Sequence, residues 1–192
     1  MKEYLKRLRH HFACLLAHRV AKGILCSKKA NLYAVASRNK DNAEQFQKQY
    51  GAEKAYGSYK ELLEDAAVDA VYICTSNSLH YEQIQLCLSY RKHVVCEKPM
   101  VENTEQVKEL FAQAKKAGCF LMEAEKTMFT PLNVKLKEMI ESGVIGKLRA
   151  IRAEYSYQVL EEVDEDHWVL DKNMGGSAYD IGVYPISFSH YF

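Results

Sequence analysis

The chain has 192 residues, of which 48% are hydrophobic, so it can form one well-packed domain, or one domain and part of a second. Its 26 basic and 25 acidic side chains nearly cancel, which excludes a global electrostatic field for nucleic acid or an anionic membrane. Six cysteines without a C-x-x-C pair predict buried thiols in a reducing compartment, with no disulfide and no bound metal.

A basic amphipathic helix is expected near the N-terminus, because apolar residues recur at helical spacing from Leu5 through Leu16 and on to Ile24. Its other face is basic, a pattern found on helices that lie on a membrane surface and, more commonly, on helices with one solvated face. The apolar run 13–17 is too short for a signal-peptide core or a transmembrane span. We therefore expect a cytoplasmic protein that binds neither membrane nor nucleic acid.

From about residue 30 to residue 123, short apolar runs alternate with stretches of helical periodicity. The runs expected to be strands are 32–37, 70–74, 93–96 and 120–122. The expected helices are 41–50, one that begins after Ser58, 79–89, and one capped by Asn103 that ends at Gly118. This alternation is typical of a doubly wound α/β domain with a parallel sheet.

A different pattern begins after residue 123. Pro131 opens a predicted helix that ends near Gly143, and residues 148–157 then alternate between apolar and polar side chains, which predicts a longer strand. The acidic run 161–166 is expected to be a solvated loop. We expect a Rossmann-like dinucleotide-binding domain over 1–123, atypical over 1–16, followed by the beginning of an α+β domain over 124–192.

Polar clusters follow the predicted strands, at the edge where a doubly wound sheet binds its ligands. Ser37 and Arg38 follow the first strand, where a dinucleotide-binding domain usually carries an acid for the adenosine ribose. A guanidinium there suits a 2′-phosphate, which favours NADP over NAD. An exposed loop arginine with no cofactor contact fits this segment equally well. Asn77 and His80 follow the second strand, either as capping and packing residues or as ligand contacts.

Glu97, Lys98 and Pro99 follow the third strand, so an adjacent carboxylate and amine lie at the same edge. Hydride transfer between an alcohol carbon and a nicotinamide requires a group that exchanges the hydroxyl proton, and a lysine whose pKa is lowered by partial burial does so near neutral pH. Lys98 is therefore the candidate acid/base. Further along, a spacing of four puts Asp180 and Tyr184 on one face of a helix, where they would assist this lysine; alone, that segment also fits an ordinary glycine turn before a helix.

Three motifs resemble the glucose-fructose oxidoreductase, inositol dehydrogenase and MocA family: T-S-N-S-L-H over 75–80, C-E-K-P over 96–99, and G-G-S-A-Y-D-I-G-V-Y over 175–184. The segments A-S-R, A-Y-G-S-Y-K-E-L-L and L-M-E-A are most similar to its NADP-dependent dihydrodiol or xylose dehydrogenase branch. The resemblance implies hydride transfer between NADP, or NAD, and a hydroxyl of a small carbohydrate, polyol or diol. It also implies a homo-oligomer for full-length members and leaves the state of this chain open.

By this resemblance Lys98 and Tyr184 are catalytic, and Asp180 belongs to the substrate site. The cofactor-side residues are then Ser37, Arg38, Thr75, Asn77, His80, Glu97 and Pro99. The sequence departs from the family in three ways. It has no glycine over 4–12, where a strand and G-x-G-x-x-G are expected, and it ends at Phe192, whereas the family continues with most of an open sheet. It also has Lys126 where the branch tends to have tryptophan. A second hypothesis therefore stays open, a truncated and catalytically inactive remnant with at most weak nucleotide binding.

Overall fold

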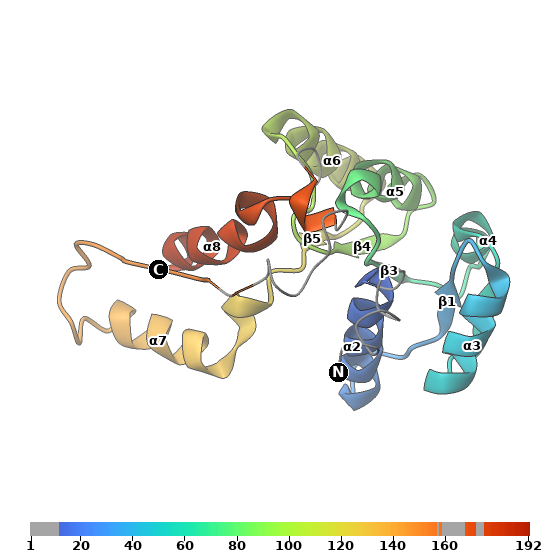
Figure 1. Ribbon diagram of the computed structural model, residues 1–192, viewed down its shortest axis with the longest axis horizontal. Helices are drawn as coiled ribbons and strands as arrows, with labels where there is room; N and C mark the ends of the chain where they lie inside the picture. Colours follow the sequence, from blue (N-terminus) through green and yellow to red (C-terminus); the bar gives the residue numbers. More distant parts are fainter. Residues whose placement is uncertain (1–11, 157, 159–167, 172–174) are drawn as a thin grey trace.

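The computed structural model describes residues 12–156, 158, 168–171 and 175–192 (Figure 1). Within them, helices and short parallel strands alternate from α2 (Phe12–Cys26) to β5 (Leu121–Glu123), which confirms the predicted α/β class. The other strands are β1 (Ala34–Ala36), β2 (Lys54–Tyr56), β3 (Ala70–Ile73) and β4 (His93–Cys96). The helices between them are α3 (Lys40–Tyr50), α4 (Tyr59–Glu64), α5 (Asn77–Ser89) and α6 (Thr104–Ala117). The predictions for Leu5, for residues 4–11 and for the acidic run 161–166 lie outside the described residues.

The described strands form two parallel sheets rather than one. β1 pairs with β2, so that Val35 lies opposite Ala55. In the second sheet β4 is central, and its Val94 lies opposite Val71 of β3 and Leu121 of β5. The sequence did not predict β2, because its three residues are too few to show a period and begin with lysine, which is depleted in strands.

Side-chain caps set the boundaries of two helices as predicted. At the start of α6, Asn103 Oδ1 accepts a hydrogen bond from the backbone N–H three residues on, at 2.9 Å. Gly118 ends that helix at a φ of 69°, in the left-handed region that favours glycine. At the start of α4, Ser58 Oγ accepts from the Glu61 N–H at 3.2 Å, and the Glu61 carboxylate reaches back to the N–H of Gly57 at 3.3 Å.

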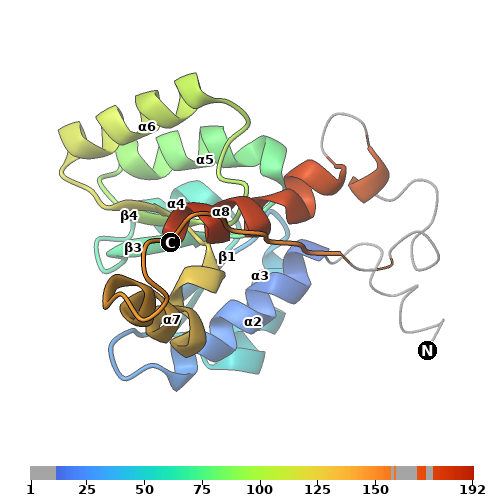
Figure 2. The same cartoon turned by 90° about the vertical axis from the view of Figure 1, so that its left-hand side faces the viewer.

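The core lies between the β3-β4-β5 sheet and helices α5 and α6, which pack side by side against it (Figure 2). Ile84 of α5, Leu110 of α6, and Val94 and Cys96 of β4 are completely buried. Val94 and Cys96 lie on the same face of β4, because alternate residues of a strand share a face, and Val95 between them is only partly buried. Burial raises the pKa of the Cys96 thiol above its usual range and that of the Cys87 thiol to about 12, so both thiols stay protonated.

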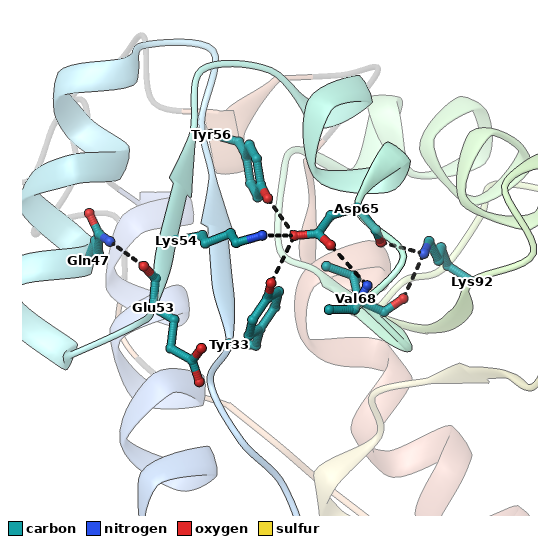
Figure 3. A network of polar contacts seen from close by, with 9 residues as sticks. Tyr33, Gln47, Glu53, Lys54, Tyr56, Asp65, Val68 and Lys92 are labelled. Carbon is teal, nitrogen blue, oxygen red and sulfur yellow. Dashed lines mark hydrogen bonds and ion pairs between the residues drawn. The ribbon is translucent and has the colours of Figure 1, made fainter.

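A polar network joins the β1-β2 sheet to the loop that follows α4 (Figure 3). Asp65 Oδ2 accepts hydrogen bonds from Lys54 Nζ at 2.7 Å, Tyr56 Oη at 2.6 Å and Tyr33 Oη at 3.0 Å. The bonds from Lys54 and then Tyr56 hold the pKa of the Asp65 carboxyl well below its usual range. From the other side, the buried Lys92 ammonium donates to two backbone oxygens of the same loop, including that of Asp65 at 2.8 Å. The loop is therefore fixed between the two sheets.

After β5 the chain continues as the 3-10 helix η1 (Lys126–Phe129), α7 (Pro131–Glu141), the 3-10 helix η2 (Trp168–Leu170), the π-helix η3 (Ala178–Gly182) and α8 (Val183–Tyr191). The helix that was predicted to begin at Pro131 is confirmed. The strand predicted over 148–157 is wrong for residues 148–156, which belong to neither sheet. Alternating side chains do not make a strand by themselves, because a strand needs a hydrogen-bonded partner, and none of the described strands pairs with this segment.

The longest described helix, α2, has 15 residues. None of the helices in the described ranges combines the length and the apolar content that crossing a membrane requires.

Candidate active site

Lys98 follows the carboxyl end of β4, the edge at which an open α/β sheet binds ligands. Its Nζ donates to Asp180 Oδ1 at 3.0 Å and to the backbone oxygen of Asp180 at 2.5 Å. The two side chains expose only 15% and 14% of their surface. The same Nζ lies 5.2 Å from the ring centroid of Tyr184. The structure therefore brings together the three residues that were predicted to be catalytic, although 82 positions separate Lys98 from Asp180.

Asp180 and Tyr184 lie where η3 continues into α8. The turn before them contains Gly176, whose φ of 89° is in the left-handed region, and the Asp180 N–H donates to the Gly176 backbone oxygen at 3.0 Å. Residues 178–182 form a π turn, which is wider than an α turn and occurs frequently at functional sites. The four-residue spacing predicted that Asp180 and Tyr184 lie on one face of a helix, and in the structure both side chains of this segment reach Lys98.

Glu97 fixes the backbone that presents Lys98. It is 9% exposed, its Oε1 accepts from the Tyr72 hydroxyl at 2.5 Å, and its Oε2 accepts from the Lys98 N–H at 3.3 Å. Its own N–H donates to the Ile73 oxygen at 2.9 Å, which extends the pairing of β3 with β4. Burial, and then the hydrogen bond to Glu97, raise the pKa of Tyr72 above its usual range, so the phenol remains a donor to the carboxylate.

His80 links the ends of β3 and β4 from within the core. It is completely buried, with Nδ1 at 2.9 Å from the Pro99 oxygen and Nε2 at 3.1 Å from the Thr75 oxygen. Both ring nitrogens therefore face backbone carbonyl oxygens, which accept hydrogen bonds and cannot donate them. The Thr75 hydroxyl donates to Gln83 Oε1 at 2.7 Å, and Asn77, at the start of α5, lines a cavity of about 160 Å³. Any influence of His80 on a cofactor therefore passes through Thr75 and Pro99.

Ser37 and Arg38 follow β1, in the other sheet. The Ser37 N–H donates to the Tyr56 oxygen at 3.2 Å, and its hydroxyl accepts from the Asn39 N–H at 3.3 Å. Asn39 in turn caps α3 by accepting from the N–H of Asp41 at 2.9 Å. Ser37 is thus part of the turn that starts the helix, while the exposed Arg38 is accessible at the carboxyl end of β1.

The sequence did not predict a role for Glu125, which the structure brings to the same region. Glu125 is 5% exposed, and its Oε1 accepts from the N–H of Thr127 at 3.1 Å and also from the Thr127 hydroxyl. Its Oε2 is buried without a hydrogen-bond partner in the part of the chain that the structure describes. The sequence signal that could have found Glu125 is an adjacent carboxylate and amine shortly after a strand: Glu125-Lys126 follows β5 after one residue, as Glu97-Lys98 follows β4.

Tyr184 lies among charged and aromatic side chains. Lys126 Nζ is 5.6 Å from its ring centroid, and the ring of Tyr155 is 5.0 Å away, centroid to centroid. Burial, and then the negative charge of Glu125, raise the pKa of Tyr184 to about 12, so the phenol is neutral and can donate a hydrogen bond at physiological pH. In the described ranges, no group of three or more histidine, cysteine or carboxylate side chains is arranged to hold a metal ion.

Comparison with known protein families identifies the class of this protein. The family model described as "Oxidoreductase family, NAD-binding Rossmann fold" (Gfo/Idh/MocA) matches residues 10–125, and the model of the Gfo/Idh/MocA C-terminal domain matches residues 133–192. The chain belongs to the Gfo/Idh/MocA oxidoreductase family.

Its relatives lie in the branch that the motifs indicated. The chain is 38% identical over 164 residues to the trans-1,2-dihydrobenzene-1,2-diol dehydrogenase of Mus musculus, a match that covers 85% of this chain and 48% of the relative. It is 40% identical over 158 residues to the enzyme of the same name from Oryctolagus cuniculus, covering 81% of this chain and 46% of the relative. The chain therefore spans about half the length of the curated relatives it matches.

Solved structures with the same fold include a putative NADPH-dependent oxidoreductase from Desulfitobacterium hafniense, with a TM-score of 0.84, 26% identity, and coverage of 90% of this chain and 50% of that one. A 3-ketoreductase from Actinomadura kijaniata in complex with NADP and TDP-benzene has a TM-score of 0.71 and 32% identity, and the match covers 86% of this chain and 50% of the ketoreductase.

Proposed function

We propose that this chain carries the acid/base lysine of an NADP-dependent oxidoreductase that transfers a hydride between the cofactor and a hydroxyl-bearing carbon of a sugar, polyol or diol. The observation that carries the proposal is the position of Lys98 Nζ, 3.0 Å from Asp180 Oδ1 and 5.2 Å from the Tyr184 ring centroid at the end of a parallel strand. Membership of the Gfo/Idh/MocA family supports the reaction class.

The proposal includes a division of the chain into a cofactor domain over 1–123 and the start of a substrate domain over 124–192. The family models support it, because one ends at residue 125 and the other begins at residue 133. A cytoplasmic location is likewise a proposal, which cell fractionation tests.

The residues present fit the two ends of the cofactor. The exposed Arg38 at the end of β1 suits the 2′-phosphate of the adenosine ribose, with Ser37 in the adjoining turn. Thr75, Asn77 and the segment Glu97–Pro99 would border the nicotinamide end, beside Lys98. No glycine precedes Gly23 in the sequence, so the fit does not extend to the glycine-rich turn that usually meets the pyrophosphate.

NADP, when bound, supplies the nicotinamide carbon that accepts the hydride from the substrate. The hydroxyl proton of the substrate passes to the Lys98 amine as the C–H bond breaks, and in the reverse direction the ammonium returns it. Asp180 orients this amine and stabilises the positive charge that forms on it, since its carboxylate lies 3.0 Å from Nζ. Tyr184, with a pKa of about 12, keeps its proton and donates a hydrogen bond to the substrate oxygen.

Substitution of Lys98 tests the assignment. Lys98→Met should lower turnover by a factor of about 10²–10⁴, the usual contribution of general acid–base catalysis, while a fluorescence titration with NADPH gives an unchanged dissociation constant. The control is methionine at Lys108, an exposed lysine of α6, which should leave both measurements unchanged. Turnover that survives in Lys98→Met would refute the role of the lysine.

Substitution of Arg38 tests the cofactor preference separately. Arg38→Asp should lower the ratio of NADP to NAD activity, because the carboxylate repels a 2′-phosphate and accepts from ribose hydroxyls. An unchanged ratio would count against the proposed phosphate contact. A cooperatively folded wild-type chain that binds neither NADPH nor NADH would overturn the proposed function as a whole.

A further inference from the structure

We propose that Glu123 is a positioning residue for Lys98, because its carboxylate fixes the backbone turn over 97–100 from which the lysine projects. The inference rests on the proposed function, since it assigns a residue that holds the proposed acid/base in place. Glu123 is the last residue of β5 and lies opposite Cys96, the last residue of β4. Its Oε1 accepts a hydrogen bond from the Met100 N–H at 2.7 Å.

The bond from Glu123 closes the turn on the side of β5. The turn follows Cys96, whose backbone oxygen accepts from the Ala124 N–H at 2.7 Å, and it ends at Met100, whose N–H donates to Glu123. Met100 is 5% exposed, so water has little access to this N–H and does not easily replace the carboxylate. A carboxylate is also a stronger acceptor than a neutral oxygen. Both ends of the turn are therefore tied to adjacent residues at the end of β5.

The other side of the turn is held by β3 and by the helix that follows it. The Glu97 N–H donates to the Ile73 oxygen at 2.9 Å, and the Pro99 oxygen lies 2.9 Å from Nδ1 of the buried His80. The Glu97 carboxylate also accepts from the Lys98 N–H at 3.3 Å. These contacts restrain the turn up to the proline, and the β5 carboxylate restrains the residue that follows it.

The ammonium of Lys98 is anchored to a different part of the chain. Its Nζ donates to Asp180 Oδ1 at 3.0 Å and to the Asp180 backbone oxygen at 2.5 Å. A shift of the turn would move the backbone of the lysine but not Asp180, so the two atoms would no longer meet at this distance. A misplacement of about 1 Å is enough to lower the rate of an enzyme about 100-fold. The carboxylate that fixes the turn therefore controls where the amine lies.

Three substitutions separate the hydrogen bond of Glu123 from its charge. Glu123→Met removes the acceptor and keeps the length of the side chain. Glu123→Gln keeps a carbonyl oxygen in the place of Oε1 and removes the charge, whereas Glu123→Asp keeps the charge and shortens the reach. The control is Glu109→Leu, at an exposed residue that accepts from the Tyr81 hydroxyl at 2.6 Å and from Gln85 at 3.2 Å, so it removes polar contacts between α5 and α6 rather than in the turn.

The first readout, in the full 192-residue chain, is competitive acetylation by acetic anhydride followed by mass spectrometry, which does not depend on turnover. In wild type, Lys98 is 15% exposed and bonded to Asp180, so it should react more slowly than the exposed Lys108. Glu123→Met and Glu123→Asp should raise the ratio of the Lys98 rate to the Lys108 rate about tenfold, which corresponds to the loss of one hydrogen bond. Glutamine, and leucine at Glu109, should leave the ratio unchanged.

The second readout is turnover of trans-1,2-dihydrobenzene-1,2-diol and of D-xylose with NADP. Glu123→Met and Glu123→Asp should lower kcat by up to about 100-fold, while glutamine keeps most of the activity. The dissociation constant for NADPH, from fluorescence titration, should be the same in all variants. Thermal unfolding identifies the variants that are folded. A glutamate that only stabilises the fold would change the melting temperature and leave the acetylation ratio as it is.

The outcomes separate the inference from the proposed function. An unchanged acetylation ratio in a folded Glu123→Met, or a glutamine variant that behaves like methionine, overturns the positioning role and leaves the proposed function intact. If Glu123→Met does not fold, the comparison of aspartate with glutamine decides, and a ratio that rises for glutamine rather than for aspartate overturns the role. Wild type that turns over neither probe counts against the proposed function, and the acetylation ratios then decide the role of Glu123 alone.

Discussion

The hydrogen bond between Tyr72 and Glu97 supports both the stability of the β3-β4 edge and the geometry of the candidate active site. Glu97 is 9% exposed and receives this bond at 2.5 Å on Oε1, while its Oε2 holds the Lys98 N–H. Tyr72→Phe removes only the phenolic hydroxyl and keeps the ring in place. The buried carboxylate then loses its one side-chain donor in the described structure.

The size of the effect follows from this geometry. Leaving one partner of a buried hydrogen bond unsatisfied costs about 1–3 kcal/mol, with more for charged groups. In a protein of 192 residues, 1 kcal/mol lowers the melting temperature by about 2–4 °C. Tyr72→Phe should therefore lower the melting temperature by about 2–12 °C.

The assay is thermal unfolding followed by circular dichroism at neutral pH. The matched control is Tyr179→Phe, which also removes a phenolic hydroxyl. Because Tyr179 is 42% exposed, water can replace the hydrogen bonds that its hydroxyl makes. Equal melting temperatures for the two variants would refute the argument, because they would mean that the Glu97 carboxylate does not depend on Tyr72.

Three other measurements test the core and the site. Leu110→Ala, at a completely buried position, should lower the unfolding free energy in urea by about 2–5 kcal/mol, and Phe111→Ala, at a residue that is 47% exposed, should change it far less. The Cys87 thiol, whose pKa is raised to about 12 by burial, should resist a thiol-disulfide reagent at neutral pH until the protein unfolds, whereas the exposed Cys26 reacts at once. The difference in ultraviolet absorbance between wild type and Tyr184→Phe should show a phenol that titrates near pH 12. This pKa exceeds the unfolded value of 10.0, so the folded state keeps the proton to a higher pH than the unfolded state does. The stability that Tyr184 contributes should therefore be lost as the pH rises from 10 to about 12. A Tyr184 transition at pH 10 would contradict its burial.

Much of the fold could be predicted because local chemistry determines it. Asn103 and Gly118 bound α6 through a side-chain cap and a left-handed terminus, both of which are readable from residue type and spacing. The predicted strand over 148–157 failed for the opposite reason, since a strand depends on a neighbour that alternation along one segment cannot reveal. The same limit hid β2 and the separation of the strands into two sheets.

In the candidate site, too, some features could be predicted from local sequence and others depend on contacts between distant segments. Lys98, Asp180 and Tyr184 could be named because each lies in a motif whose chemistry and order are distinctive. The complete burial of His80 and the unpaired oxygen of Glu125 could not be predicted, since both depend on which segments come together in space. The sequence therefore named the candidate reacting groups, but it did not reveal how the residues around them are buried and paired.

The contact between Lys98 and Asp180 also bears on the order in which contacts form while the chain is synthesised. The strands of both sheets and their helices are complete by residue 123, but the carboxylate that holds the Lys98 ammonium lies 82 positions after the lysine. At a synthesis rate of about 5–20 residues per second, roughly 4–16 s pass between these two residues. During that interval the lysine lacks this carboxylate, so the ion pair of the candidate site forms only after the strands of both sheets and the helices between them have been synthesised.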